Sequence, residues 1–96
     1  MNNYLIVNNN NRVFEAFGQD NEKDAVKVYL DGFVSEGNKM KPIFDKVYKE
    51  LSVDEMIELF FRMFDCYVDE DDKIKYIYTV GENVYEHWYF RKNKQY

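Results

Sequence analysis

Residues 51–67, LSVDEMIELFFRMFDCY, carry the strongest local structural signal in the chain. Ser52 and Glu55 have the spacing of a capping box, in which each side chain bonds the backbone N–H of the other at the start of a helix. Large apolar residues then recur at helical spacing, namely Met56, Ile57, Phe60, Met63, Phe64 and Tyr67. The pattern predicts an amphipathic helix over residues 53–67 whose apolar stripe faces the core.

Two shorter helical patterns precede this segment. Asp20 or Asn21 is placed to cap the first, which continues to a stop at Gly37-Asn38. Pro42 suits the first turn of the second, because its missing N–H is not needed there. The apolar faces consist of Val26, Tyr29, Leu30, Phe33 and Val34 in the first and Ile43, Phe44, Val47, Tyr48 and Leu51 in the second. Three consecutive helices are therefore expected in the middle of the chain.

Runs rich in β-branched and aromatic residues lie on both sides of these helices. Residues 4–7 (YLIV) and 12–17 (RVFEAF) flank an Asn-rich turn, and Asn tolerates the left-handed backbone that tight hairpins need. Residues 74–80 (IKYIYTV) and 84–91 (VYEHWYFR) flank the turn sequence GEN. We expect one α+β domain over residues 1–96, in which two β-hairpins form an antiparallel sheet and the three helices cover one face (ββαααββ).

Composition limits the classes of protein to which the chain can belong. It has 96 residues, of which 46% are hydrophobic and 19% aromatic, enough for a modest core without disulfides. The single cysteine, Cys66, cannot form an internal disulfide, which suggests a reduced protein of the cytoplasm. The N-terminal sequence lacks the basic and apolar regions of a signal peptide, and no apolar run approaches the roughly 20 residues of a membrane span. We expect no membrane association.

The net charge of −5 is a local feature of the sequence. Residues 54–72 contain eight acids and one base, Arg62, so this segment carries −7 and the rest of the chain +2. The acids are Asp54, Glu55, Glu58, Asp65, Asp69, Glu70, Asp71 and Asp72. Direct binding of nucleic acid is disfavoured, because the chain would repel phosphate. The segment is either a solvated helix face and turn, or an acidic surface that binds a basic groove in the way nucleic acid does.

Motifs for catalysis, cofactors and metals are sparse. Registers that start at Asp65 or Asp69 fail the EF-hand pattern, because neither places Gly at position 6 or Glu at position 12. His87 is the only histidine, so a histidine-rich metal site cannot form, and an enzyme would have to combine it with a residue such as Glu86. The four glycines are scattered and form no phosphate-binding loop. We therefore expect a protein that is not an enzyme and has no cofactor or metal.

The last predicted hairpin has large residues on both faces of each strand. One face can pack on the helices, which leaves tyrosines on the other, and surface Tyr and Trp often anchor protein interfaces. Tyr85 and Tyr89 share one side of residues 84–91 and are candidates for partner binding. The same face would also allow a homodimer. The simpler alternative is that these rings only fill the second face, with their hydroxyls in water.

The chain is short, acidic and rich in Asn, Lys, Tyr and Phe, as its ends MNNYLIVNNNN and FRKNKQY illustrate. In this overall style it resembles small inhibitor proteins of AT-rich phages and mobile elements, the anti-CRISPR proteins among them. The resemblance implies a protein that blocks the basic nucleic-acid-binding site of a host enzyme. We expect the acidic segment 54–72 and surface tyrosines to make that contact. The alternative is a self-associating structural or accessory protein that dimerises through the C-terminal aromatic hairpin.

Overall fold

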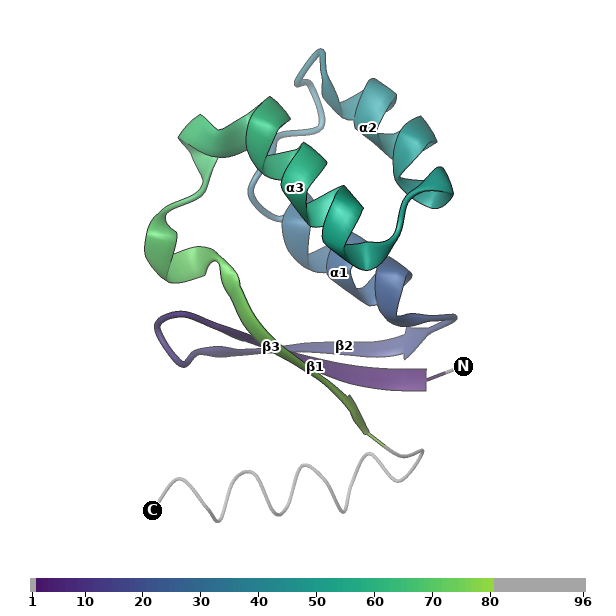
Figure 1. The fold of residues 1–96 in the computed structure, drawn as a ribbon, viewed down its shortest axis with the longest axis vertical. Coiled ribbons are helices and arrows are strands. Elements are labelled where there is room, and N and C mark those ends of the chain that lie inside the picture. Colours follow the sequence, from purple (N-terminus) through teal and green to yellow (C-terminus); the bar gives the residue numbers. More distant parts are fainter. Residues whose placement is uncertain (1, 81–96) are drawn as a thin grey trace.

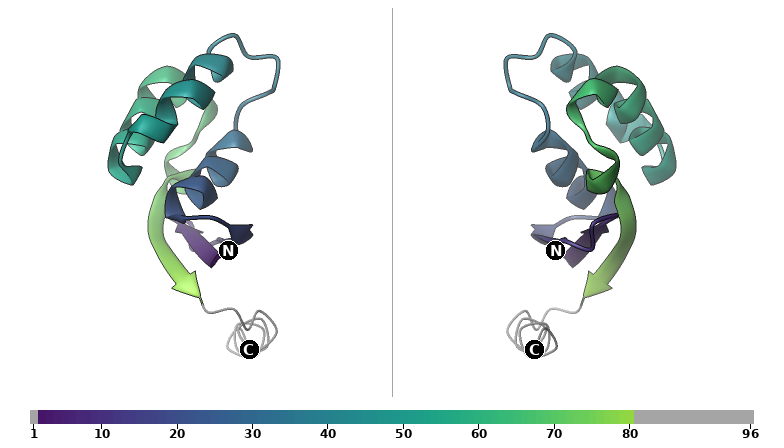
Figure 2. Two further views of the ribbon diagram at one scale, coloured as in Figure 1. Left: turned by 90° about the vertical axis from the view of Figure 1, so that its right-hand side faces the viewer. Right: turned by 90° about the vertical axis from the view of Figure 1, so that its left-hand side faces the viewer.

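The computed structural model describes residues 2–80 (Figure 1). Three strands form one antiparallel sheet in the order β2-β1-β3, with bounds β1 Asn2–Asn8, β2 Val13–Gln19 and β3 Ile74–Val80. Three α-helices lie between β2 and β3 in sequence, namely α1 Glu22–Asp31, α2 Lys41–Val47 and α3 Val53–Phe64. All three lie on the same side of the sheet, with α1 next to the strands and α2 and α3 beyond it (Figures 1 and 2). The order in this range is β-β-α-α-α-β.

This arrangement confirms the α+β class, the antiparallel sheet and the three helices, and it matches the predicted two-hairpin layout only in part. The first hairpin is β1–β2, as expected, but the partner of β3 within the described residues is β1. The N-terminal strand is therefore central, and Leu5 lies between Glu15 and Tyr78. β1 suits this place because its run of apolar residues is buried on both faces. Residues 84–91, predicted as the second strand of the C-terminal hairpin, lie outside the described residues.

The Asn-rich turn between β1 and β2 forms largely as its composition predicts. Asn8 is buried, and its Oδ1 accepts hydrogen bonds from the backbone N–H groups of Asn10 at 3.0 Å and Arg12 at 2.9 Å. Asn11 has a φ of 60°, in the left-handed region that Asn tolerates. The side chain of Asn8 therefore fixes the shape of the turn from inside it.

Both predicted side-chain caps are present. Asn21 caps α1, and its Oδ1 accepts from the N–H of Asp24 at 2.9 Å. In the capping box of α3, Ser52 Oγ accepts from the N–H of Glu55 at 3.1 Å, and the N–H of Ser52 donates to Glu55 Oε1 at 2.9 Å. The hydrogen bond from the Ser52 backbone, with that of its side chain, holds the pKa of the Glu55 carboxyl below its ordinary value.

The helices end earlier than their apolar patterns predict. α1 stops at Asp31, just before Gly32, so Phe33 and Val34 pack against the core from the following loop. α2 and α3 each continue as one 3₁₀ turn, Tyr48–Glu50 and Asp65–Tyr67. Residues in such a turn stay near the face of the helix that precedes them, so apolar spacing alone does not show where the α-helix ends.

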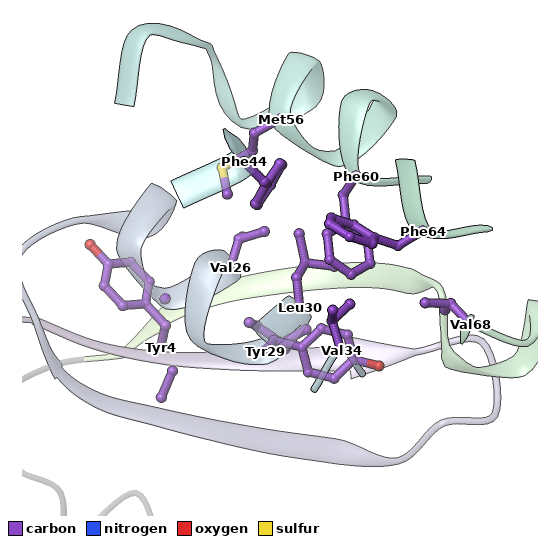
Figure 3. Packing of buried hydrophobic residues seen from close by; sticks show 13 residues of the cluster. Tyr4, Val26, Tyr29, Leu30, Val34, Phe44, Met56, Phe60, Phe64 and Val68 are labelled. Carbon is purple, nitrogen blue, oxygen red and sulfur yellow. The ribbon is translucent and has the colours of Figure 1, made fainter. Parts of the chain in front are cut away.

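The core has two parts, one between the sheet and α1 and one between α1 and the other two helices (Figure 3). Its largest fully buried side chains are Phe44, Phe60, Phe64, Ile6, Leu30, Met56 and Val26. Phe60 packs against two of them, with ring centroids 4.9 Å from Phe64 and 5.4 Å from Phe44. α1 is therefore covered by the sheet on one side and by α2 and α3 on the other.

A charge cluster joins α1 to α2 at the margin of this core. Lys27 Nζ lies 2.6 Å from Asp31 Oδ2 and 2.8 Å from Asp45 Oδ1. Lys41 Nζ completes the cluster at 3.6 Å from Asp31 Oδ1 and 3.4 Å from Asp45 Oδ2. The Lys27 ammonium also lies 5.2 Å from the centre of the Tyr48 ring. Each of the two lysines therefore pairs with both aspartates.

The cluster shifts the pKa values of two of its members, Lys27 and Asp45. Burial alone would lower the pKa of Lys27, but hydrogen bonds to Asp31 and Asp45 and their charges outweigh it, so the pKa lies above its ordinary value. Burial alone would raise the pKa of Asp45, but its bond to Lys27 and the charges of both lysines outweigh that effect and lower it. Both shifts favour the charged forms of Lys27 and Asp45 at neutral pH.

Candidate protein-binding surface

The predicted acids of α3 are exposed, and most of them share one stripe of the helix. Asp54 and Glu58 are about one turn apart, and Asp65 follows at the C-terminal end, about three turns from Asp54. At about 1.5 Å per residue, the stripe is about 16 Å long. Glu55 is also exposed, but its carboxylate is engaged with Ser52 in the capping box.

The acidic run that follows is a 3₁₀ turn, Glu70–Asp72, fixed to the rest of the fold. The backbone N–H of Asn9 donates to Lys73 O at 3.0 Å, and its Nδ2 donates to Glu70 O at 2.9 Å. The N–H of Asn10 donates to Asp71 O at 3.1 Å. The run therefore rests on the Asn-rich turn between β1 and β2, a contact between segments that are far apart in sequence.

Tyr29 anchors the same turn from the core side. Its hydroxyl donates to the backbone carbonyl of Asp72, and its ring packs edge-on against Phe14 with centroids 5.3 Å apart. Burial raises the pKa of the Tyr29 hydroxyl. All of these anchoring bonds use backbone carbonyls, so the carboxylates of Asp69, Glu70 and Asp71 stay exposed, while Asp72 is half-buried.

Lys73 connects the turn to the end of α3. Its Nζ lies 3.0 Å from Glu70 Oε2 and 5.0 Å from the centre of the Phe61 ring. The hydrogen bond to Glu70, together with the charges of Glu70 and Asp65, raises the pKa of Lys73. Arg62, the one base of the segment, forms no ion pair with its acids in residues 2–80. We call the exposed acids of the stripe and the turn the acidic surface, comprising Asp54, Glu58, Asp65, Asp69, Glu70 and Asp71.

The predicted tyrosines divide between described and undescribed residues. Tyr85 and Tyr89 lie outside the described residues. Tyr76 and Tyr78 are about half exposed, at 51% and 50%, and their ring centroids are 6.0 Å apart. Ile77 between them pairs with the buried Ile6 and belongs to the helix side, so these two tyrosines face away from the helices.

The acids are apparent in the sequence, but the residues that position them are not. Asn9, Asn10 and Tyr29 donate to backbone carbonyls, and a pattern of side chains does not indicate such contacts. The Asn-rich composition of the turn is the one related signal, and it predicts only a hairpin. Among residues 2–80, no group of three or more His, Cys, Asp or Glu side chains is placed to hold a metal ion. No helix in the same range has the length and apolar character needed to cross a membrane.

Comparison of the chain with known protein families, curated proteins and solved structures gave no match.

We expect Tyr29→Phe to loosen the acidic turn while the fold is kept. The change removes the hydroxyl that donates to Asp72 and leaves the ring in the core, so it should cost about 1 kcal/mol. The Asn9 amide, which donates to Lys73 O at the end of the turn, should then exchange its hydrogen faster. Tyr48→Phe is the matched control, because its hydroxyl lies 3.4 Å from Asp24 Oδ1, away from the turn. Equal exchange of Asn9 in both variants would contradict the anchoring role.

Proposed function

We propose that this protein acts by binding another protein, as a phage or mobile-element inhibitor of the anti-CRISPR kind. Its acidic surface would occupy the basic nucleic-acid-binding site of a host enzyme. The observation that supports the proposal is the anchored acidic turn. Its carbonyls are held by Asn9, Asn10 and Tyr29, while the carboxylates of Asp69, Glu70 and Asp71 are exposed.

Anchoring matters because binding by a mobile segment costs conformational entropy. Fixing one residue's backbone costs about 1–2 kcal/mol, so a run of four acids already held in place avoids much of that loss on binding. A turn needed only for solubility gains nothing from such anchoring. The fixed carboxylates also form a local negative field that attracts a basic partner and speeds its association.

The acidic surface has two parts, the stripe and the turn that follows it. The stripe is about 16 Å long and ends at Asp65. Lys73 pairs with Glu70 of the turn and also lies near Asp65, so it offsets part of the negative charge where the two parts meet. In this role the protein would act in the cytoplasm beside its target and would need no catalytic group or cofactor.

The test is to neutralise the turn and compare it with an equal change of charge elsewhere. The variant carries Asn or Gln at all four acids of the run, namely Asp69, Glu70, Asp71 and Asp72. The control neutralises four acids that are exposed and lie outside the acidic surface, namely Asp20, Glu22, Glu36 and Glu50. Association with purified CRISPR effector nucleases and other host nucleases is measured from low to high salt.

The turn variant should associate about 10-fold more slowly at low salt, because steering by charge raises association rates by 10-fold or more. The difference should shrink as salt screens the surface over about 8–10 Å. The control should keep most of the parent's rate. Both variants should melt near the parent, because all of these acids except the half-buried Asp72 are exposed and the pair of Glu70 with Lys73 lies at the surface, where an ion pair contributes little to stability. A nuclease that binds the turn variant and the control at the same rate would show that the run serves only to solvate the chain.

A further inference from the structure

The α2 segment, which we define as residues 35–50, contains α2 and the 3₁₀ turn after it and lies on the side of α1 away from the sheet (Figure 2). Its backbone hydrogen bonds close within the segment, for example from Asn38 N–H to Ser35 O and from Tyr48 N–H to Phe44 O. Among residues 2–80, no hydrogen bond between backbone groups joins the segment to the sheet, α1 or α3. Contacts of side chains therefore hold it against the other helices.

One apolar side chain anchors the α2 segment in the core. Phe44 is 1% exposed, and its ring centroid lies 5.4 Å from that of Phe60 and 6.1 Å from that of Phe64, both on α3. It is the one member of the segment among the largest fully buried side chains, whose other members belong to the sheet, α1 and α3. Val47 and Tyr48 beside it are half-buried. Most of the apolar core therefore lies outside the segment.

Charged and polar contacts join the α2 segment to α1. The Lys27 ammonium of α1 lies 2.8 Å from Asp45 Oδ1 of the segment, and Lys41 Nζ of the segment pairs with α1 in turn. Two further polar contacts join the same parts of the chain, namely Lys23 Nζ to Lys49 O at 3.0 Å and the Tyr48 hydroxyl to Asp24 Oδ1 at 3.4 Å. Water can replace contacts of this kind. It does so least well for the Lys27 side chain, which is 11% exposed and the most buried of the charge cluster.

We propose that the α2 segment opens as a unit while the sheet, α1 and α3 stay folded, and that Lys27 is the residue that keeps it closed. Proteins open locally in cooperative units, and units with few buried apolar contacts open at the lowest free energy. Opening removes Phe44 from the core and exposes the rings of α3 that it covers. The closed protein hides this apolar surface, whereas the acidic surface lies outside the segment in both states.

Hydrogen exchange of the full-length protein at low urea concentrations measures this opening. The amides of α2 and its C-cap, among them that of Tyr48, should share one opening whose urea dependence is smaller than that of global unfolding. Lys27→Met should speed their exchange about 5–30-fold, because only the closed state contains the charge cluster. Lys46→Met removes an exposed lysine of the same helix and is the matched control, which should leave their exchange unchanged. Equal exchange of these amides in both variants would overturn the role of Lys27.

Ile6→Val separates this opening from global unfolding. Ile6 is fully buried on the central strand, and we expect it to stay buried when the α2 segment opens. The variant should therefore speed exchange of the sheet amides about 2–10-fold and leave that of the α2 amides unchanged. If the α2 amides speed by the same factor as the sheet amides, the segment opens only with the whole domain and the proposal is wrong. In the parent protein, α2 amides protected as strongly as those of β1 would also overturn it, whether or not any variant folds.

Discussion

Phe60→Ala is expected to lower the free energy of unfolding by about 3–5 kcal/mol. Phe60 is 1% exposed and packs against Phe44 of α2 and Phe64 of α3, so the truncation opens a cavity where these two helices meet. Domains of this size are stable by only about 5–15 kcal/mol, so the loss is a large share of the total. Urea unfolding followed by far-UV circular dichroism measures it directly.

Ile43→Ala is the control for this prediction. Ile43 is also a large apolar residue on a helix, but it is 51% exposed, so its truncation should change stability by no more than about 0.5 kcal/mol. Similar losses in the two variants would mean that the packing of α3 on α2 contributes little. An unchanged urea midpoint for Phe60→Ala would contradict the described core.

Lys27→Met is expected to cost about 1–3 kcal/mol at neutral pH. The change leaves Asp31 and Asp45 close together with only Lys41 to balance them, at 3.6 Å and 3.4 Å. Removing one member of a buried pair costs about 3–5 kcal/mol, and we expect less here because the two aspartate side chains are 33% and 39% exposed. Met keeps the apolar stem of the lysine, so the loss measured is mainly that of the charge.

Two further variants test whether the lost charge is the cause. Lys46→Met removes an exposed lysine of the same helix as Asp45 and should be nearly neutral. Adding Asp45→Asn to Lys27→Met should recover part of the loss, because it removes one of the two carboxylates that repel each other. A double variant as unstable as the two separate losses combined would show that the residues do not act as a cluster.

The pH dependence of this cluster follows from the directions of its pKa shifts. The pKa of Asp45 in the folded state lies below the ordinary value of 3.8, so its contribution is present above that pH and is lost as pH falls through the folded pKa. The pKa of Lys27 lies above 10.5, so its contribution is complete below that pH and is lost as pH rises through the folded pKa. The difference in stability between the parent and Lys27→Met should therefore be constant near neutral pH and decline at both extremes.

Local features of the fold were predictable from sequence, whereas contacts between distant segments were not. Asn21 and Ser52 could be identified as caps because a cap acts within three residues. The burial of Lys27 could not be identified in this way. α1 lies between the sheet and the other two helices, so it has two buried sides, and an amphipathic pattern describes only one. The anchoring of the acidic turn has no local signal for a similar reason, because its partners lie between 43 and 61 residues earlier in the chain.

The central position of β1 determines the order in which the sheet can assemble. Ile6 and Phe14 face each other across a short hairpin, which can form within about 1–10 μs. The other edge of β1 pairs with β3, and Leu5 and Tyr78 are 73 residues apart. At a synthesis rate of about 5–20 residues per second, the ribosome needs roughly 4–15 s to make that stretch. During this time the apolar edge of the nascent hairpin has no neighbouring strand. This edge is then the part of the nascent chain most available for binding by chaperones and for aggregation.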